Sequence, residues 1–324
     1  MRIYAALADR ALVIHAARRD QTVAIERVFD ALTEISPQCV GADPAQPDRA
    51  FVGTRESGLW RFGDGDSSRV DSFDSAHVTA VTVSPHDPDV VWAGTEPSAV
   101  YRSDNGGDSW THCDGLTELP SASEWSFPPR PHTHHVRWLS VNPADVEELY
   151  VAIEAGAFVR TTDAGQTWID HPDGGRRDNH TLATHPDAPE RIYTAAGDGY
   201  AESNDGGENW QYPQDGLDHR YVWGLAVDSG DPNRVLVSAA SGANAAHRRG
   251  ESYVYRKEGD HWERAMNGLP PAEGTKRAVL VAGRPSEFFA LTNHGLWYTA
   301  DGADSWTQLD VPGTTIGRGL AVVG

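Results

Sequence analysis

The octapeptide TTDAGQTW at Thr161–Trp168 decides the fold, because near-copies of it recur along the chain. The other copies are SDNGGDSW at Ser103–Trp110, SNDGGENW at Ser203–Trp210 and TADGADSW at Thr299–Trp306. A weaker copy, KEGDHW, ends at Trp262. The shared pattern is Ser/Thr-x-Asp-x-Gly-x-x-Trp, and several near-complete copies of an eight-residue pattern do not arise by chance. The chain is therefore built from repeats.

Each copy has the chemistry of a tight turn between two strands. A short apolar strand such as AVYR precedes it. The glycine can take a positive φ, and the Asp and Ser/Thr side chains can accept hydrogen bonds from N–H groups of the turn. We therefore expect Asp163, Asp205 and Asp301 to hold turns and not to act as catalytic acids. Asn105 replaces the aspartate and Ala303 the glycine, so two of the turns are imperfect copies.

The spacing of the motif tryptophans predicts a β-propeller. Successive tryptophans lie 58, 42, 52 and 44 residues apart, and periods in the forties with four strands per unit are typical of propeller blades. The motif resembles the Asp-box, or bacterial neuraminidase (BNR), repeat of sialidase-like β-propellers. This resemblance covers essentially the whole chain, but it identifies turn residues and transfers no catalytic residue.

Six blades can be counted along the chain, and both ends are left over. The inner strands of these blades begin near Gln38, Val78, Val136, Thr181, Val222 and Arg277. The C-terminal segment GRGLAVVG has the pattern of a lone inner strand, and residues 1–30 supply three more strands. We therefore predict an all-β, seven-bladed propeller with four-stranded blades. Residues 316–324 should pair with the N-terminal strands and close the ring, which removes exposed sheet edges.

Two insertions lengthen the period within what we expect to be a single domain, residues 1–324. Residues 116–134 hold four prolines together with Trp125 and Phe127, and residues 241–251 hold His247, Arg248 and Arg249. Long loops on a rigid scaffold are where function concentrates. We expect the first insertion to be ordered, because proline stiffens it and its aromatic side chains favour burial.

The composition is acidic and poor in lysine. The chain has 47 Asp plus Glu against 27 Lys plus Arg, a net charge of −20, and only Lys257 and Lys276 are lysines. Such a surface stays hydrated in concentrated salt, which also screens the self-repulsion of the charge. We therefore expect a halophilic, cytoplasmic protein of haloarchaeal type, with an acidic mesophilic protein as the alternative. Dialysis into low salt should loosen a halophilic fold.

Charge and hydropathy also exclude several classes of protein. An acidic chain lacks the basic stripe that binds phosphates, so we expect no nucleic-acid partner. No apolar run approaches the roughly 18 residues of a membrane span, and the N-terminus lacks the core of a signal peptide. Cys39 and Cys113 fall in or beside strands and should be reduced packing residues. No metalloprotease, phosphate-loop or nucleophile-elbow motif occurs.

Equivalent positions in the repeats predict a site at the mouth of the central channel. The aligned inner-strand positions are Gln38, Thr79, Arg137, His180, Trp223, Arg277 and Arg318. Two residues before four of them lie His77, His135, Asp178 and Tyr221, and the facing loops add Arg55, Glu96, Glu154, Asp9 and Asp198. Polar groups that converge on a concavity are the default site hypothesis. The predicted ligand-binding residues are His135, Arg137, His180, Tyr221, Trp223, Arg55 and Arg277.

Three functional interpretations stay open at this point. The first is a binding or assembly module that holds a small molecule, a carbohydrate or a protein at the channel mouth. In this respect the chain resembles the luminal domain of sortilin and the photosystem II assembly factors. The second is a glycoside hydrolase, because sialidases and xyloglucanases share these repeats. Its candidate catalytic carboxylates are Glu154 and Glu96, provided that they lie about 5–10 Å apart.

The resemblance to the two hydrolase families is incomplete. Sialidases carry an arginine triad, a Tyr–Glu nucleophile pair, an acidic Asp and usually an Arg-Ile-Pro motif on six blades. Here Arg137, Arg277 and Arg318 match the triad in residue type only, and no Arg-Ile-Pro occurs. Xyloglucanases need two propellers that face each other, whereas this chain supplies one.

The third interpretation is a metal site and is the only one that implies a cofactor. His77, His135 and His180, with Glu154 or Asp178, are ligand types suited to zinc or another divalent transition ion. These histidines would come from separate blades, so no sequence spacing tests the idea. The alternative is that they are hydrogen-bonded histidines of a ligand pocket.

Overall fold

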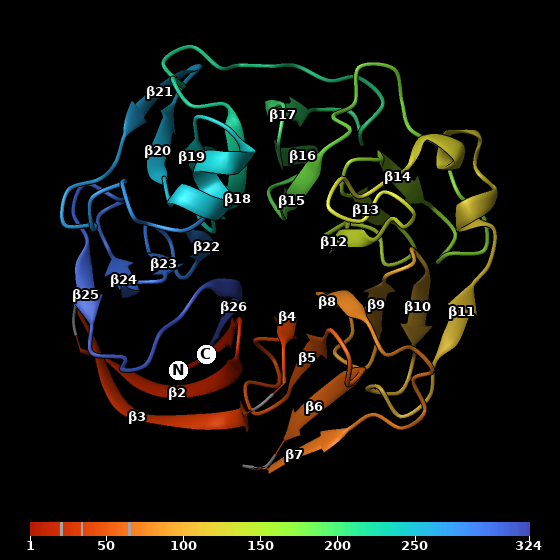
Figure 1. The fold of residues 1–324 in the computed structure, drawn as a ribbon, viewed down its shortest axis with the longest axis horizontal. Helices are drawn as coiled ribbons and strands as arrows, with labels where there is room; N and C mark the ends of the chain where they lie inside the picture. The colour runs from red at the N-terminus through yellow and green to blue at the C-terminus, as the bar shows by residue number, and fades with distance from the viewer. Residues whose placement is uncertain (20–21, 34, 64–65) are drawn as a thin grey trace.

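The computed structural model describes residues 1–19, 22–33, 35–63 and 66–324. They form seven antiparallel sheets arranged radially around a central axis (Figure 1). The prediction of an all-β, seven-bladed propeller is confirmed. We number the blades in chain order: blade 1 is β4–β7, blade 2 is β8–β11, blade 3 is β12–β14, blade 4 is β15–β17, blade 5 is β18–β21, blade 6 is β22–β25, and blade 7 joins β26 to β1–β3.

The strands are short, and each blade runs from an inner strand near the axis to an outer strand at the rim. Blades 1 to 3 contain β4 (Pro37–Ala42), β5 (Ala50–Thr54), β6 (Leu59–Gly63), β7 (Asp66–Arg69), β8 (Val78–Val83), β9 (Val91–Thr95), β10 (Val100–Ser103), β11 (Thr111–Cys113), β12 (Val136–Val141), β13 (Leu149–Ile153) and β14 (Ala157–Thr161). Blades 4 to 6 contain β15 (Asn179–His185), β16 (Ala188–Ala196), β17 (Gly199–Ser203), β18 (Tyr221–Asp228), β19 (Asp231–Ala240), β20 (Tyr253–Glu258), β21 (His261–Arg264), β22 (Val279–Ala282), β23 (Phe288–Thr292), β24 (Gly295–Thr299) and β25 (Thr307–Leu309).

Blade 7 closes the ring by joining the two ends of the chain. It contains β26 (Gly317–Val323), β1 (Arg2–Leu7), β2 (Arg10–Arg19) and β3 (Thr22–Thr33). β26 is the inner strand and pairs antiparallel with β1, so that Ala5 faces Leu320. The two termini therefore lie side by side (Figure 1). This closure confirms the predicted pairing. In blades 3 and 4 the fourth strand is reduced to one bridge each, Arg160 with Ile169 and Glu202 with Gln211.

The repeated octapeptides form the predicted turns. In the copy that begins at Thr161, the hydroxyl Oγ1 accepts a hydrogen bond from Gly165 N at 2.9 Å, and Asp163 Oδ1 accepts one from Thr167 N at 2.8 Å. Asn105 accepts the equivalent bond from Ser109 N at 2.9 Å, so the amide substitutes well for the carboxylate. The weaker copy before Trp262 is instead the hairpin between β20 and β21.

The glycine of the turn is required by the packing between blades. A Cβ atom on Gly107 would lie 2.7 Å from the Phe51 ring of blade 1, and one on Gly207 would lie 2.7 Å from the Phe158 ring of blade 3. Both glycines also have φ near +88°, a conformation that L side chains rarely adopt. The core thus lies in layers between neighbouring blades, where rings such as Phe51 are fully buried.

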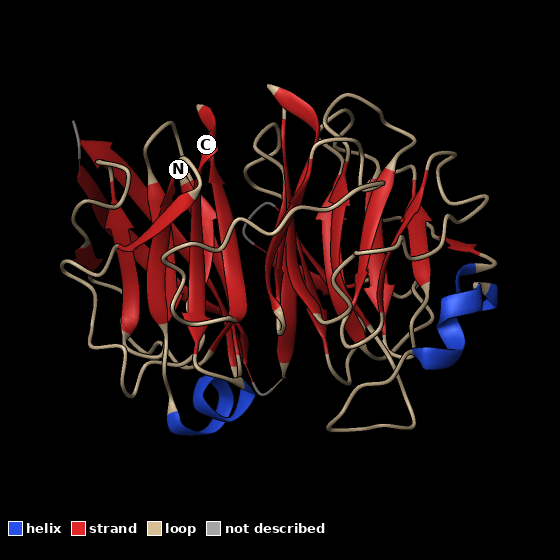
Figure 2. Cartoon of the chain, turned by 90° about the horizontal axis from the view of Figure 1, so that it is seen from above, coloured by secondary structure: helices blue, strands red, loops and turns tan. Residues whose placement is uncertain are grey.

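Both insertions are folded against one face of the disc. The first contains the helical turns η1 (Leu116–Glu118) and η2 (Pro120–Glu124), and the second contains the short helix η3 (Ala245–Arg249). Figure 2 shows the helical turns toward the same face. Trp125 is buried and donates a hydrogen bond to Ser121 Oγ at 3.1 Å, which anchors the first insertion as predicted.

Two further expectations concern cysteines and membranes. Cys39 and Cys113 are free and buried, so they are packing residues. Within the described ranges, no helix has the length and apolar character needed to cross a membrane.

Candidate functional site: a polar cavity at the channel mouth

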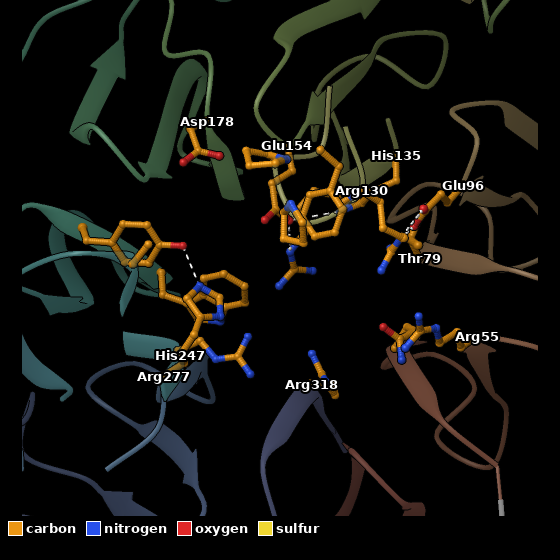
Figure 3. Close-up of a pocket in the computed structure, with 18 of the residues that line it drawn as sticks. Arg55, Thr79, Glu96, Arg130, His135, Glu154, Asp178, His247, Arg277 and Arg318 are labelled. Carbon is orange, nitrogen blue, oxygen red and sulfur yellow. Dashed lines mark hydrogen bonds and ion pairs between the residues drawn. The ribbon is translucent and has the colours of Figure 1, made fainter. Parts of the chain in front are cut away.

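A cavity of about 710 Å³ opens on the axis of the propeller (Figure 3). All seven blades contribute to its wall, and both insertions reach it. Its volume is that of a typical small-molecule site. The blades contribute Gln38, Arg55, His77, Thr79, Glu96, His135, Arg137, Glu154, Asp178, Tyr221, Trp223, Arg277 and Arg318, and the insertions contribute Phe127, Pro128, Pro129, Arg130, Ala243, Asn244, His247 and Arg248.

The structure brings most of the sequence-predicted positions together in this wall. His180 is the exception among the predicted ligand-binding residues, because its side chain is fully buried behind the wall. Its Nδ1 lies 2.7 Å from Val222 O, and its ring lies 4.5 Å from that of Trp223. Asp9 and Asp198 also lie outside the lining.

Sequence reasoning missed Arg130 and His247 as members of the site. Both lie in the insertions, which the sequence marked as candidate functional loops but could not align with the repeats. The only available signal was the presence of basic residues and histidine in loops that interrupt a rigid periodic scaffold.

Glu96 is saturated with hydrogen bonds from the first insertion. Arg130 Nε donates to Glu96 Oε1 at 2.8 Å and Arg130 Nη2 to Oε2 at 2.5 Å, a bidentate pair. His77 Nδ1 lies 3.3 Å from the same Oε2. Burial alone would raise the pKa of Glu96, but the bond from Arg130 and the charge of His77 outweigh it, and the net shift is downward. Glu96 is therefore a fixed anion that holds the Pro-rich insertion in place.

Glu154 is a buried anion on the neighbouring blade. His135 Nε2 lies 3.0 Å and Arg137 Nε 3.4 Å from Glu154 Oε2. Burial opposes the charge, yet the bond from His135 and the positive charges of His135, His180 and Arg137 prevail, so the pKa of Glu154 is well below its usual range. Glu154 is therefore ionised at neutral pH.

The pKa of Asp178 is shifted upward, in the opposite direction to that of Glu154, although the two side chains lie close together. One oxygen of each carboxylate lies within 4.8 Å of the other and of a His180 nitrogen. Burial raises the pKa of Asp178, the negative charge of Glu154 raises it further, and His180 opposes the shift only in part. The environment thus pushes the pKa values of two adjacent carboxyl groups apart, an arrangement associated with acid–base roles.

The cavity is positively charged in an otherwise acidic protein. Six arginines line it against three carboxylates: Arg55, Arg130, Arg137, Arg248, Arg277 and Arg318 against Glu96, Glu154 and Asp178. Arg277 is 6% exposed, and among the described residues its guanidinium forms no ion pair and no hydrogen bond. Burial and the charges of Arg318 and Arg137 lower the pKa of Arg277 to about 10. Burial, Arg137 and Arg55 also lower the pKa of Arg318.

The ring of Trp223 packs against two of the cavity arginines and against His247. The Cζ atoms of Arg137 and Arg277 lie 4.8 and 4.6 Å from the ring centroid. The ring of His247 packs edge-on at 5.0 Å. Stacking fixes the two guanidinium groups in position; Arg137 is also paired with Glu154, whereas Arg277 has no ion pair among the described residues, so its N–H groups remain available to a ligand.

A chain of hydrogen bonds links the second insertion to the wall. Tyr221 Oη lies 2.6 Å from His247 Nε2 and 3.4 Å from His180 Nε2. The Nδ1 atom of His180 faces Val222 O, so its Nε2 atom is the one that faces Tyr221. Burial and the charges of Arg277 lower the pKa of His247 to about 4, so His247 is neutral at physiological pH.

The metal interpretation fits this geometry poorly. Within the described part of the chain, Glu154, Asp178 and His180 are the group with metal-ligand spacing. The predicted trio of histidines does not gather, because His77 pairs with Glu96 and His135 with Glu154. The positive charge of Arg137 beside Glu154 further disfavours a divalent cation.

Comparison with known proteins supports the fold. No protein-family model and no curated protein sequence matches the chain. The GH74 xyloglucanase from Xanthomonas campestris superposes with a TM-score of 0.67 at 17% identity, over 84% of this chain and 45% of that one. The Niastella koreensis GH74 enzyme has a TM-score of 0.67 at 14% identity, over 94% and 55% of the two chains.

A shorter neighbour is YCF48 bound to D1 peptide, with a TM-score of 0.61 at 16% identity over 92% of this chain and 85% of that one. The chain spans only 36% to 55% of the length of the GH74 structures. At these identities the likeness establishes the propeller fold, and neither hydrolysis nor peptide binding follows from it.

Proposed function

We propose that the protein is a ligand-binding propeller that holds an anionic ligand in the cavity at the channel mouth. The observation that carries this proposal is the pair Arg277 and Arg318, which form no ion pair with any described residue and whose Nε atoms are buried without a hydrogen-bond partner among those residues. A buried cation without a partner is costly, and a second one beside it adds repulsion. A carboxylate or phosphate group placed between them would supply the missing charge and hydrogen bonds.

The expected contribution is large enough to anchor a small ligand. A hydrogen bond to a charged group contributes about 1.5–3 kcal/mol, and two guanidinium groups offer several donors in fixed directions. The solved neighbours differ in what their titles describe, a xyloglucanase and a propeller bound to a peptide. The choice of an anion therefore rests on the charges of this chain and not on those proteins.

Calorimetry with phosphate, sulfate and a simple carboxylate such as butanoate tests the proposal. Arg277→Gln and Arg318→Gln should each weaken binding about 10- to 100-fold, which corresponds to roughly 1.4–2.8 kcal/mol. Arg61→Gln is the matched control, because Arg61 pairs with Asp108 and does not line the cavity. Absence of binding by all three anions, or equal binding by the cavity variants and the control, would contradict the proposal.

Glycoside hydrolysis is the second candidate function, and the opposite pKa shifts of Glu154 and Asp178 favour it. The pairing differs from the one predicted from sequence, because both oxygens of Glu96 are occupied by Arg130. If the protein hydrolyses aryl glycosides, Glu154→Gln and Asp178→Asn should each abolish turnover, whereas Glu96→Gln should retain it. Turnover that survives in the Asp178 variant would remove this pair from consideration.

A further inference from the structure

The cavity has two chemically different sides. Arg277, Arg318 and Arg55 come from blades 6, 7 and 1, whereas Glu154 and Asp178 come from blades 3 and 4. Figure 3 shows the two carboxylates across the opening from Arg277 and Arg318. A ligand held by its anionic group at the arginines therefore extends toward the carboxylates.

On the side of the cavity formed by Glu154 and Asp178, each carboxyl group has an oxygen that accepts no hydrogen bond from a described residue. Glu154 Oε2 is bonded to His135, but Oε1 accepts no hydrogen bond from any described residue. Asp178 Oδ1 accepts one from Ala155 N at 3.1 Å, and Oδ2 accepts none within the described ranges. Glu96 is the contrast, because Arg130 occupies both of its oxygens.

The spacing of Glu154 and Asp178 suits a single bridging donor. Their oxygens approach within 4.8 Å, and hydrogen bonds to a hydroxyl or an amino group are about 2.7–3.0 Å long. One amino nitrogen placed between the two carboxyl groups can therefore donate to both, whereas a hydroxyl donates its single proton to one of them and accepts a proton from the other when that carboxyl group is protonated. The side chain of Asp178 is 35% exposed, so such a group can reach it from the cavity.

A metal ion is a poor occupant of the same position. Arg137 Nε lies 3.4 Å from Glu154 Oε2, so a cation bound to this carboxylate would lie close to a guanidinium group. A neutral hydroxyl or a singly charged amino group avoids most of the repulsion that a divalent cation would meet from Arg137, Arg277 and Arg318.

We propose, building on the proposed anion binding, that the ligand is bifunctional: an anionic group contacts Arg277 and Arg318, and a hydroxyl or amino group at the other end forms hydrogen bonds with both Glu154 and Asp178. Inorganic phosphate or sulfate would satisfy only the first half of this site. The ligand class is therefore a hydroxy- or amino-substituted organic anion.

A homologous series of probes tests this bifunctional site. Butanoate, pentanoate and hexanoate would each be compared with the same chain carrying a terminal hydroxyl or amino group, so that the distance between the two groups is varied. At the length that reaches both sides of the cavity, the substituted anion should bind about 10-fold tighter or better, as expected for one or two hydrogen bonds to charged groups. The proposal is overturned if no substituted anion exceeds its parent at any length.

Variants of Asp178 distinguish the two donor groups. Asp178→Ala should remove the advantage of both substituents, whereas Asp178→Asn should remove that of the amino group and keep part of that of the hydroxyl. Asp218→Asn is the control, because Asp218 pairs with Arg264 outside the cavity. Thermal unfolding of each variant shows that it is folded.

The same measurements distinguish failure of the bifunctional site from failure of anion binding. If the parent anions bind and Arg277→Gln weakens them, but the substituents add nothing, anion binding stands and the bifunctional site fails. If neither the parent nor the substituted anions bind, the proposed anion binding itself fails.

Discussion

Two clusters of charge in this propeller differ in whether their charged groups have ion-pair partners. Between blades 4 and 5, Glu202 accepts bonds from Lys257 Nζ at 3.0 Å, Arg191 Nη2 at 3.0 Å and Tyr200 Oη at 2.7 Å. In the cavity, Arg277 and Arg318 have no such partners among the described residues. Lys257 is 3% exposed and Arg277 is 6% exposed, so burial alone does not identify a site.

Unsatisfied charge is the property that distinguishes the proposed binding site from the structural cluster. Lys257 is 3% exposed and is one of only two lysines in the chain, and its positive charge is offset by the carboxylate of Glu202. A complete network stabilises the packing of two blades. An incomplete network costs stability unless a ligand completes it, and enzymes and binding proteins commonly accept that cost.

The largest effect is expected when the complete cluster is broken. Glu202→Leu leaves Lys257 and Arg191 buried without their anion and should lower the free energy of unfolding by about 3–5 kcal/mol. Urea unfolding measures this change. Adding Lys257→Met to the variant should restore part of the stability. An unchanged midpoint for Glu202→Leu would contradict the contrast between the clusters.

An intermediate effect is expected from the pH dependence of His247. The unfolded chain protonates this residue near pH 6.5, whereas the folded protein does so only near pH 4, because of burial and the charges of Arg277. Below pH 6.5 the unfolded state binds more protons, so stability should fall as the pH drops and the loss should be complete near pH 4. Allowing for solvent screening, His247 should contribute about 2 kcal/mol.

Comparison with His247→Asn isolates this contribution from that of the carboxylates. Stability curves measured between pH 7 and 4.5 should be shallower for the variant. A bound anion should also flatten the wild-type curve, because it offsets the charges of Arg277 and Arg318 that disfavour protonation of His247. Parallel curves for the two proteins would show that His247 is not held neutral by the arginines.

The smallest effect has the opposite sign and concerns the incomplete cluster. Arg318→Gln removes one of the mutually repelling cations and should raise the free energy of unfolding by about 0.5–2 kcal/mol while it weakens anion binding. The same urea titration, with and without phosphate, measures both changes. If the Arg318 variant were less stable than the wild type, the cavity arginines would be stabilised by partners within the protein, and no ligand would be needed to offset their charge.

Much of the candidate site could be located from sequence, because residues at the same position in each repeat lie at the same level along the propeller axis. Thr79, Arg137, Trp223 and Arg318 occupy equivalent places in different blades, and the structure places all four in the cavity wall. Equal offsets from a repeated turn imply equal positions on equivalent strands. The same reasoning cannot tell which face of a strand a neighbouring blade covers, and His180 accordingly lies behind the wall.

The saturation of Glu96 could not be predicted from sequence. It depends on Arg130, which lies 34 residues away in an insertion that has no counterpart in the other blades. Whether Glu96 is a free acid or a fixed anion is decided by where that loop folds. Sequence therefore paired Glu96 with Glu154, whereas the structure places Asp178 beside Glu154.

By itself, the sequence determined the propeller. The turns are held by contacts within eight residues, such as Thr161 with Gly165 and Asp163 with Thr167, and local contacts of this kind recur wherever the motif recurs. Only the tertiary structure decided which charges are paired. Partners such as Arg130 with Glu96, or Tyr221 with His247, come from a periodic strand and an aperiodic loop. Their meeting depends on the packing of the whole ring, and among the described residues this packing leaves Arg277 and Arg318 without an anion.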